Sequence, residues 1–194
     1  MMTGILVPGL GYTTQAPLLD LADAALSDRR CDVEHIAWVV PDGLLQVGPE
    51  PFVRAHLTAA LHRLQQADPQ RSVVVIAKSL GSYAAALVAE RGLPAVWLTP
   101  VLTDESVVDS IAASSAPALL IGGTADRLWV PEAAEATGKQ TLTILDGSHS
   151  LRVPGPLRRY AEVLASVGTA MEEFLDALMP TTTRQAGRIT GLRR

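Results

Sequence analysis

Short runs of β-branched and aliphatic residues alternate with longer helix-compatible segments along almost the whole chain. Runs that are apolar on both faces are typical of strands buried in a parallel sheet, and parallel strands need helical crossovers between them. The pattern predicts strands at residues 4–7, 33–39, 72–76, 95–99, 118–122 and 142–145. It predicts helices at residues 16–28, 51–67, 79–91, 103–114, 131–137 and 156–178. We therefore expect a three-layer α/β/α sandwich with a mostly parallel sheet of about six strands.

The length of 194 residues suits one hydrophobic core better than two, and the chain shows no internal repeat and no linker. The last fourteen residues carry four arginines and no acid, whereas the rest of the chain holds 12 basic and 20 acidic residues. We expect one domain over residues 1–179 and a flexible basic tail over residues 180–194.

Composition excludes several classes of function. An acidic body disfavours nucleic acid as a partner, and no apolar run approaches the length of a membrane helix. Cys31 is the only cysteine, which excludes an internal disulfide and favours a reducing cytoplasm. No His, Cys, Asp and Glu group has metal-ligand spacing, and the glycines at 9 and 11 lack the third glycine of a dinucleotide loop. We expect no metal and no cofactor.

One serine lies between a predicted strand and a predicted helix. Ser79 follows the strand 72–76 and is flanked by Ala77 two positions before it and Gly81 two positions after it. A sharp strand-to-helix turn requires small residues at these two positions, because their side chains would otherwise collide. Such a turn presents the hydroxyl at the edge of the sheet, where a nucleophile would be placed. A serine that merely caps a helix is the alternative interpretation.

Three further loops follow predicted strands, and the carboxyl ends of parallel strands share one edge of the sheet. They contain Asp126, His149 and the segment 8–11. A histidine can take the proton of a serine hydroxyl, and a carboxylate fixes the histidine tautomer. The backbone N–H groups of Leu80 and Leu10 are the expected donors to a developing oxyanion.

Other residues compete for these roles. The alternative interpretation of Asp126 is that it only caps a turn. Asp104, after the strand 95–99, is the rival candidate for the acid. His56 and His62 lie on one predicted helix and are expected to face solvent, while His35 falls within a strand pattern. His149 is the one histidine in a loop after a strand.

These loops together resemble the α/β-hydrolase family over residues 3–178, most closely its small lidless members that are similar to dienelactone hydrolase. The matching segments are residues 77–81 as nucleophile elbow, 122–126 as acid loop, 147–151 as histidine loop and 8–11 as oxyanion loop. Two departures are Ala77, where an elbow glycine is commoner, and Pro8, where many members have histidine. The resemblance implies a minimal α/β-hydrolase fold and a serine hydrolase that cleaves a small ester, thioester or related acyl compound through a Ser79, His149 and Asp126 triad.

The segment after the strand 95–99, where this family commonly inserts a cap, has room for one helix only. The resemblance therefore implies an open site without a cap domain. Tyr12, Leu102 and Trp129 are candidates to contact the substrate, with packing against loop backbones as their alternative, and Lys78 is expected to point away from the nucleophile. A noncatalytic small-molecule-binding protein on the same scaffold is the alternative function, and the sequence leaves the oligomeric state open.

Overall fold

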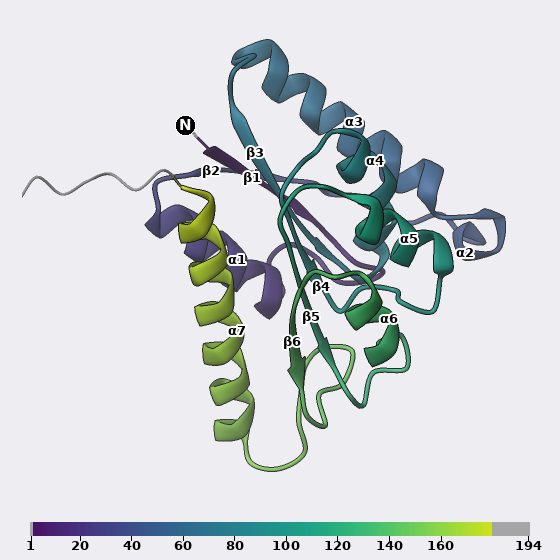
Figure 1. Ribbon diagram of the computed structural model, residues 1–194, viewed down its shortest axis with the longest axis vertical. Coiled ribbons are helices and arrows are strands. Elements are labelled where there is room, and N and C mark those ends of the chain that lie inside the picture. The colour runs from purple at the N-terminus through teal and green to yellow at the C-terminus, as the bar shows by residue number, and fades with distance from the viewer. Residues whose placement is uncertain (1, 180–194) are drawn as a thin grey trace, which may run out of the picture.

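Six parallel strands form one open sheet in the computed structural model, which describes residues 2–179 (Figure 1). The strands are β1 (Met2–Val7), β2 (Asp32–His35), β3 (Ser72–Lys78), β4 (Ala95–Leu98), β5 (Ala118–Gly123) and β6 (Gln140–Ile144). Their order across the sheet is β2-β1-β3-β4-β5-β6, and each neighbouring pair is parallel. All six carboxyl ends therefore lie at one edge of the sheet.

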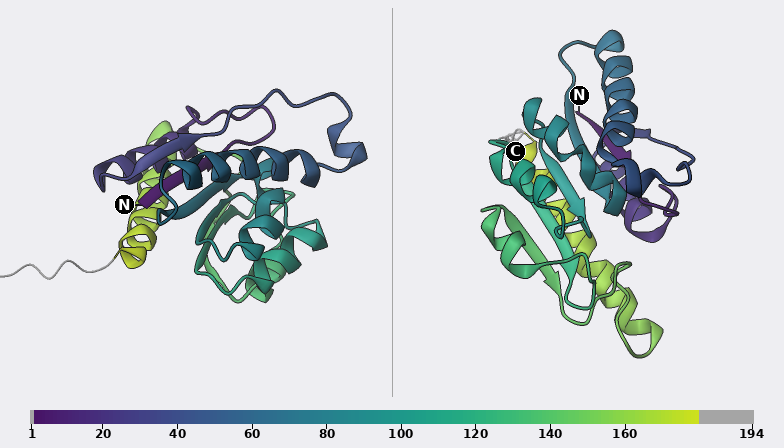
Figure 2. Two further views of the ribbon diagram at one scale, coloured as in Figure 1. Left: turned by 90° about the horizontal axis from the view of Figure 1, so that it is seen from above. Right: turned by 90° about the vertical axis from the view of Figure 1, so that its right-hand side faces the viewer.

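Helices cover both faces of this sheet (Figures 1 and 2). One face carries α1 (Pro17–Asp28) and α7 (Leu157–Leu178), which pack against each other. The other face carries α3 (Glu50–Ala67), the 3₁₀ helix η1 (Ser79–Ala84), α4 (Ala85–Glu90), α5 (Glu105–Ala113) and α6 (Pro131–Ala136). A short helix, α2 (Leu44–Val47), lies in the segment that leads into α3.

Alternate residues of the central strands supply two separate hydrophobic cores. Val75 and Trp97 pack under the layer of α3 to α6, while Ile76 and Leu98 pack under α1 and α7. Side chains of successive strand residues point to opposite faces, so a strand buried on both faces must be apolar throughout. The apolar runs of the sequence are explained by this arrangement.

The predicted three-layer architecture is confirmed, and the sheet is fully parallel. The strand predicted at 33–39 is shorter, because β2 ends at His35. Ile36 still donates its N–H to Leu6 O at 3.0 Å, but β1 ends at Val7 and offers no further partner. The sequence does not predict the helix α2, and the first six residues of the helix predicted at 79–91 form a 3₁₀ helix.

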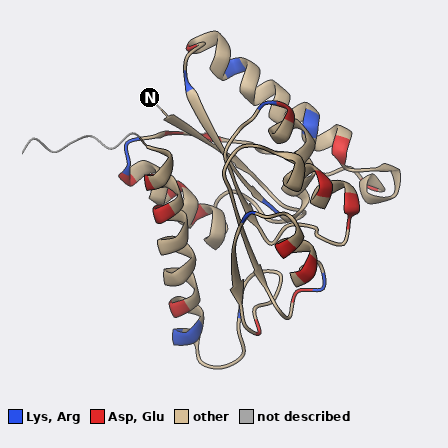
Figure 3. Ribbon diagram, viewed as in Figure 1, with Lys and Arg blue, Asp and Glu red and all other residues tan. Residues whose placement is uncertain are grey.

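Charged residues lie mainly on the outer helices and loops, around a sheet of largely apolar strands (Figure 3). Arg29 pairs with Asp176 at 2.6 Å and so links α1 to α7. Within residues 2–179, no helix combines the length and apolar character that a membrane crossing requires. The expected basic tail, residues 180–194, lies outside the described residues.

We expect Gly122→Ala to destabilise the fold. A Cβ at Gly122 would lie 1.9 Å from Cε3 of Trp129, whose ring is itself buried, so the core would have to shift. Overpacking of this kind costs about 1–3 kcal/mol. Urea denaturation should show this loss in the free energy of unfolding.

Gly168→Ala is the matched control. A Cβ at Gly168 would lie 3.4 Å from the nearest atom of Leu21, which is ordinary contact, and alanine favours the α7 helix. We expect this variant to be as stable as the parent or up to about 1 kcal/mol more stable. Equal destabilisation of both variants would contradict the steric explanation.

Candidate active site

The backbone turns sharply at Ser79, between β3 and η1. Ser79 has a positive φ of 52°, a conformation that costs L-residues free energy. A Cβ at Gly81 would lie 2.9 Å from Val7 O, and Ala77 is completely buried against the core. Both small flanking residues are therefore required by close packing, as the sequence predicts. Ser79 is the first residue after the carboxyl end of β3.

The loops that contain Asp126 and His149 are joined by hydrogen bonds in which backbone N–H groups are the donors. Ala125 donates its N–H to Gly147 O at 3.0 Å, and the Asp146 N–H donates to Thr124 Oγ1 at 2.8 Å. A Cβ at Gly123 would lie 2.1 Å from Gly147 O, so only glycine allows this approach. Two loops that are separated in the sequence are thereby held in one fixed arrangement.

Ser79, His149 and Asp126 form a continuous chain of contacts. His149 Nε2 lies 2.7 Å from Ser79 Oγ, and His149 Nδ1 lies 2.7 Å from Asp126 Oδ2. Asp126 is buried, and its Oδ1 accepts a hydrogen bond from the Leu128 N–H at 3.0 Å. A carboxylate fixed in this way can hold the histidine in the tautomer that accepts a proton from serine. A serine that acts as a nucleophile requires a geometry of this kind.

The rival acid, Asp104, is engaged elsewhere. Its Oδ1 accepts hydrogen bonds from the Ser106 N–H at 3.0 Å and from Ser106 Oγ at 2.7 Å. The Ser106 hydroxyl is the largest influence that holds the pKa of the Asp104 carboxyl below its ordinary value. Asp104 is the N-cap of α5, which is a sufficient reason for a carboxylate at this position.

The loop after β1 brings backbone donors to the same edge. The Gly9 N–H donates to Tyr12 O at 2.9 Å and closes a turn over Leu10 and Gly11. A Cβ at Gly9 would lie 3.3 Å from Lys78 O, which places the turn directly beside the nucleophile elbow. The Leu10 N–H makes no hydrogen bond to any acceptor in residues 2–179, and the Leu80 N–H belongs to the first turn of η1, where helix N–H groups lack partners.

Lys78 has a contact that sequence reasoning missed. Its side chain is 1% exposed, its Nζ donates to His149 O at 3.0 Å, and it lies 4.8 Å from the centre of the Tyr12 ring. Burial lowers the pKa of this ammonium group to about 8, and the charge of Asp126 opposes the shift. Lys78 thus joins the elbow, the histidine loop and the oxyanion loop. In the sequence, the only signal that Lys78 has a role at this site is its position directly before Ser79.

The three residues proposed to contact a substrate occupy different environments. Tyr12 is partly buried, and it lines a cavity of about 550 Å³ between residues 8–15 and 35–40. Leu102 and Trp129 are 3% and 5% exposed in the hydrophobic core. Their backbones support the acid loop, since Leu102 N–H donates to Leu128 O at 2.9 Å and Trp129 N–H to Asp126 O at 3.2 Å. Their burial favours the packing alternative.

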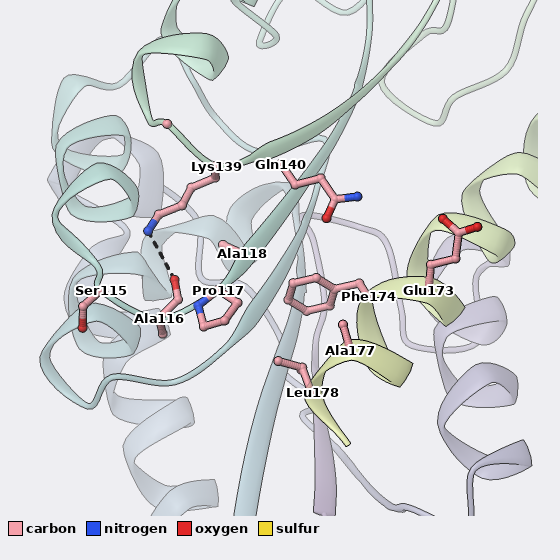
Figure 4. A pocket seen from close by; sticks show the side chains of 11 residues that line it. Ser115, Ala116, Pro117, Ala118, Lys139, Gln140, Glu173, Phe174, Ala177 and Leu178 are labelled. Carbon is pink, nitrogen blue, oxygen red and sulfur yellow. Dashed lines mark hydrogen bonds between the residues drawn. The ribbon is translucent and has the colours of Figure 1, made fainter. Parts of the chain in front are cut away.

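A second cavity, of about 460 Å³, lies at the opposite edge of the sheet (Figure 4). It is bordered by the amino ends of β5 and β6 and by the last turn of α7. Lys139 Nζ donates to the Ser114 and Ala116 carbonyls there, so its charge is already solvated by the backbone. Parallel sheets bind ligands at the carboxyl ends of their strands, and this cavity is therefore not part of the candidate site.

Among residues 2–179, no three His, Cys, Asp or Glu side chains are placed to hold a metal ion. His62 is exposed, as the sequence suggested, whereas His56 is only partly exposed because it packs against Phe52 and Trp38. His35 is at the end of β2 and pairs with Asp23 at 3.0 Å. His149 is thus the histidine that reaches the candidate nucleophile.

We expect Lys78→Met to change how stability depends on pH. The folded-state pKa of Lys78 is about 8, below the ordinary value of 10.5, so burial of its charge destabilises the fold below pH 8. Between these pH values the unfolded chain binds the proton more strongly, and the parent gains stability as pH rises. Relative to Lys78→Met, this gain should be on the order of 3 kcal/mol.

Chemical denaturation of both proteins from pH 7 to 10.5 measures this difference. Tyrosines titrate in both proteins, so their contribution cancels in the comparison. A stability difference that does not change with pH would show that the Lys78 charge is not held in a desolvated site.

Comparison with known proteins identifies the fold. No family model matches the chain, and no curated protein matches it. Among solved structures, the lidless α/β serine hydrolase XC6422 from Xanthomonas campestris is similar, with a TM-score of 0.70 and 17% identity over 93% of this chain and 84% of that chain.

Two esterases are also similar. Est1E from Butyrivibrio proteoclasticus, in a structure with bound ferulic acid, has a TM-score of 0.70 and 14% identity over 91% of this chain and 89% of that chain. The esterase Pf2001 from Pyrococcus furiosus has a TM-score of 0.64 and 16% identity over 91% of this chain and 82% of that chain. Together with the parallel sheet and its flanking helices, these similarities show that the chain has the α/β-hydrolase fold, in a small form.

Proposed function

We propose that this chain is a serine hydrolase that cleaves a small ester, thioester or related acyl compound. The observation that carries the proposal is the pair of 2.7 Å contacts that link Ser79 Oγ to His149 and His149 to Asp126. A serine hydroxyl needs a base to become a nucleophile, and the base needs a carboxylate to orient it. The hydrolases and esterases of similar fold support the same reaction class.

The first half of the reaction forms an acyl-enzyme. Ser79 Oγ attacks the carbonyl carbon of the substrate while His149 Nε2 takes the hydroxyl proton. The carbonyl oxygen becomes negatively charged, and the N–H groups of Leu10 and Leu80 donate hydrogen bonds to it. The carbon–oxygen or carbon–sulfur bond to the leaving group then breaks, and the histidine returns the proton to that group.

The second half regenerates the enzyme. A water molecule gives a proton to His149 and attacks the acyl carbon, through a second oxyanion in the same position. Collapse of this intermediate breaks the bond to Ser79 Oγ, which recovers its proton from His149. The carboxylic acid is released. The Asp126 carboxylate stabilises the charged imidazole in both halves.

The cavity beside the loop 8–11 favours a small and largely apolar substrate. It is about 550 Å³, within the usual range of ligand pockets, and Leu10, Tyr12, Trp38 and Val39 contribute to its walls, while Ser79 and His149 are not among its lining residues. The bound ferulic acid of Est1E shows that a protein of this fold takes an aromatic acid. Short acyl esters, including aryl esters, are the first substrates to examine.

Ser79→Ala should abolish turnover of p-nitrophenyl acetate, since no other hydroxyl lies against His149 Nε2 in the described chain. The variant should also lose covalent labelling by a fluorophosphonate probe. Ser82→Ala is the matched control, because Ser82 is three residues away and only binds the Val101 N–H through its Oγ. Labelling of the Ser79→Ala protein at the parent rate would refute the proposed nucleophile.

Asp126→Asn and Asp104→Asn separate the two candidate acids. With its oxygen kept on the Leu128 N–H, asparagine at 126 presents its NH2 group to His149 Nδ1 and favours the tautomer that cannot accept a proton at Nε2, so we expect kcat to fall by roughly 10³–10⁴-fold. Asparagine at 104 still caps α5, so kcat should stay within about twofold of the parent and the free energy of unfolding should change little. Steady-state kinetics on both variants decides the assignment, and a larger loss at 104 would reverse it.

The alternative function, a noncatalytic small-molecule-binding protein, predicts different results in these experiments. The parent protein would bind short acyl esters without hydrolysing them and would form no fluorophosphonate adduct. Such a protein has no need of a serine, a histidine and a buried carboxylate in contact, which is why the enzyme is preferred.

A further inference from the structure

We propose that Trp38 is a positioning residue, which orients the Leu10 N–H toward the substrate oxyanion. The inference rests on the proposed function, because it assigns Leu10 as one donor of the oxyanion hole. Its evidence is one hydrogen bond and the geometry of a single peptide group.

The indole N–H of Trp38 donates to the carbonyl oxygen of Gly9 at 3.4 Å. That carbonyl and the Leu10 N–H belong to the same peptide group. In a trans peptide the C=O and N–H point in opposite directions within one plane, and the structure has no cis peptide in its described part. A bond that fixes the direction of Gly9 O therefore also fixes the direction of the Leu10 N–H.

The order of the strands indicates where the Leu10 N–H is directed. In the sheet, β1 lies between β2 and β3. Trp38 follows β2, the Gly9–Leu10 peptide follows β1, and Ser79 follows β3. Because the carbonyl accepts from a residue that follows β2, we infer that the opposed N–H faces the β3 side, where Ser79 follows its strand. In residues 2–179 this N–H has no acceptor of its own and is available to a ligand.

This peptide has little restraint beyond its own turn. Glycines stand at positions 9 and 11, on both sides of Leu10, and Gly11 has a positive φ of 63°. A bridge between Gly9 and Tyr12 closes the turn, but glycine permits backbone conformations that other residues do not, so the local sequence adds little to fix the peptide between them. The Leu10 side chain is 53% exposed and gives the turn little anchorage.

The indole is itself held in place. Its ring centre lies 5.3 Å from that of Phe52 and 5.5 Å from that of His56, in tilted and edge-on arrangements, and both partners are on α3. The His56 ring is fixed in turn by a hydrogen bond between Nδ1 and Phe52 O at 2.8 Å. The aromatic group of Trp38, Phe52 and His56 thus connects a rigid helix to the oxyanion loop.

The sharpest test removes the N–H and leaves the shape of the ring. Trp38 also lines the cavity described above, so truncation would disturb substrate binding as well as the hydrogen bond. Incorporation of 3-benzothienylalanine at position 38 replaces the N–H by sulfur in a ring of nearly equal size. For p-nitrophenyl acetate we expect kcat to fall roughly tenfold, less than the loss of a whole oxyanion donor, with KM within about twofold. Incorporation of 7-azatryptophan, which retains the N–H, should restore kcat.

Backbone order at Leu10 gives a readout that does not depend on activity. In ¹⁵N relaxation measurements, the order parameter of the Leu10 amide should fall from about 0.85 in the parent to below about 0.6 in the 3-benzothienylalanine protein. The same replacement at Trp97, which is buried in the core on β4, is the matched control and should change neither readout.

The outcomes separate this inference from the proposed function. Unchanged kcat and unchanged Leu10 order in the 3-benzothienylalanine protein, with Ser79-dependent hydrolysis intact, would overturn the role of Trp38 alone. Equal losses at position 97 would overturn it as well. If the parent has no Ser79-dependent hydrolysis, the proposed function fails, and an unchanged order parameter would then also refute the peptide contact itself.

Discussion

The left-handed turn at Ser79 is the constraint on which the rest of the site depends. A non-glycine residue in this conformation costs about 1–2 kcal/mol, and the surrounding packing must hold it there. The end of β1 lies so close to the turn that a side chain at Gly81 would meet Val7 O. The same closeness brings the loop after β1 beside the hydroxyl. One steric condition therefore sets both the position of the Ser79 hydroxyl and that of the loop after β1.

The loops around the serine are held in two different ways. The acid and histidine loops follow adjacent strands, and a backbone hydrogen bond from Ala125 N–H to Gly147 O joins them directly. The oxyanion loop has few backbone partners and is fastened by side chains, with Lys78 against Tyr12 and Trp38 against Gly9. A connection through backbone hydrogen bonds tolerates changes of side chain, whereas a connection through side chains depends on particular residues. Substitutions that alter rate without altering the fold are thus expected around the oxyanion loop.

Sequence reasoning succeeded where the signal is local. The apolar runs predict the strands, and the carboxyl ends of parallel strands bring Ser79, Asp126 and His149 to one edge. It was less successful where the outcome depends on packing between distant segments. The length of β2 follows from where β1 stops, and the burial of Leu102 and Trp129 follows from the core beneath the acid loop. Lys78 was expected to point away from the nucleophile and was given no role, because nothing in its neighbours along the chain reveals that its ammonium group reaches His149 O.

Peptide mapping of the covalent adduct tests the central claim most directly. After reaction with a fluorophosphonate, cleavage at Lys78 and Arg91 releases a peptide of residues 79–91, which contains Ser79, Ser82 and Tyr83. Fragmentation mass spectrometry should place the whole phosphonyl mass on Ser79 and none on its two neighbours. An adduct on any other residue, or no adduct on folded protein, would contradict the account of Ser79 as a nucleophile activated by His149 and Asp126.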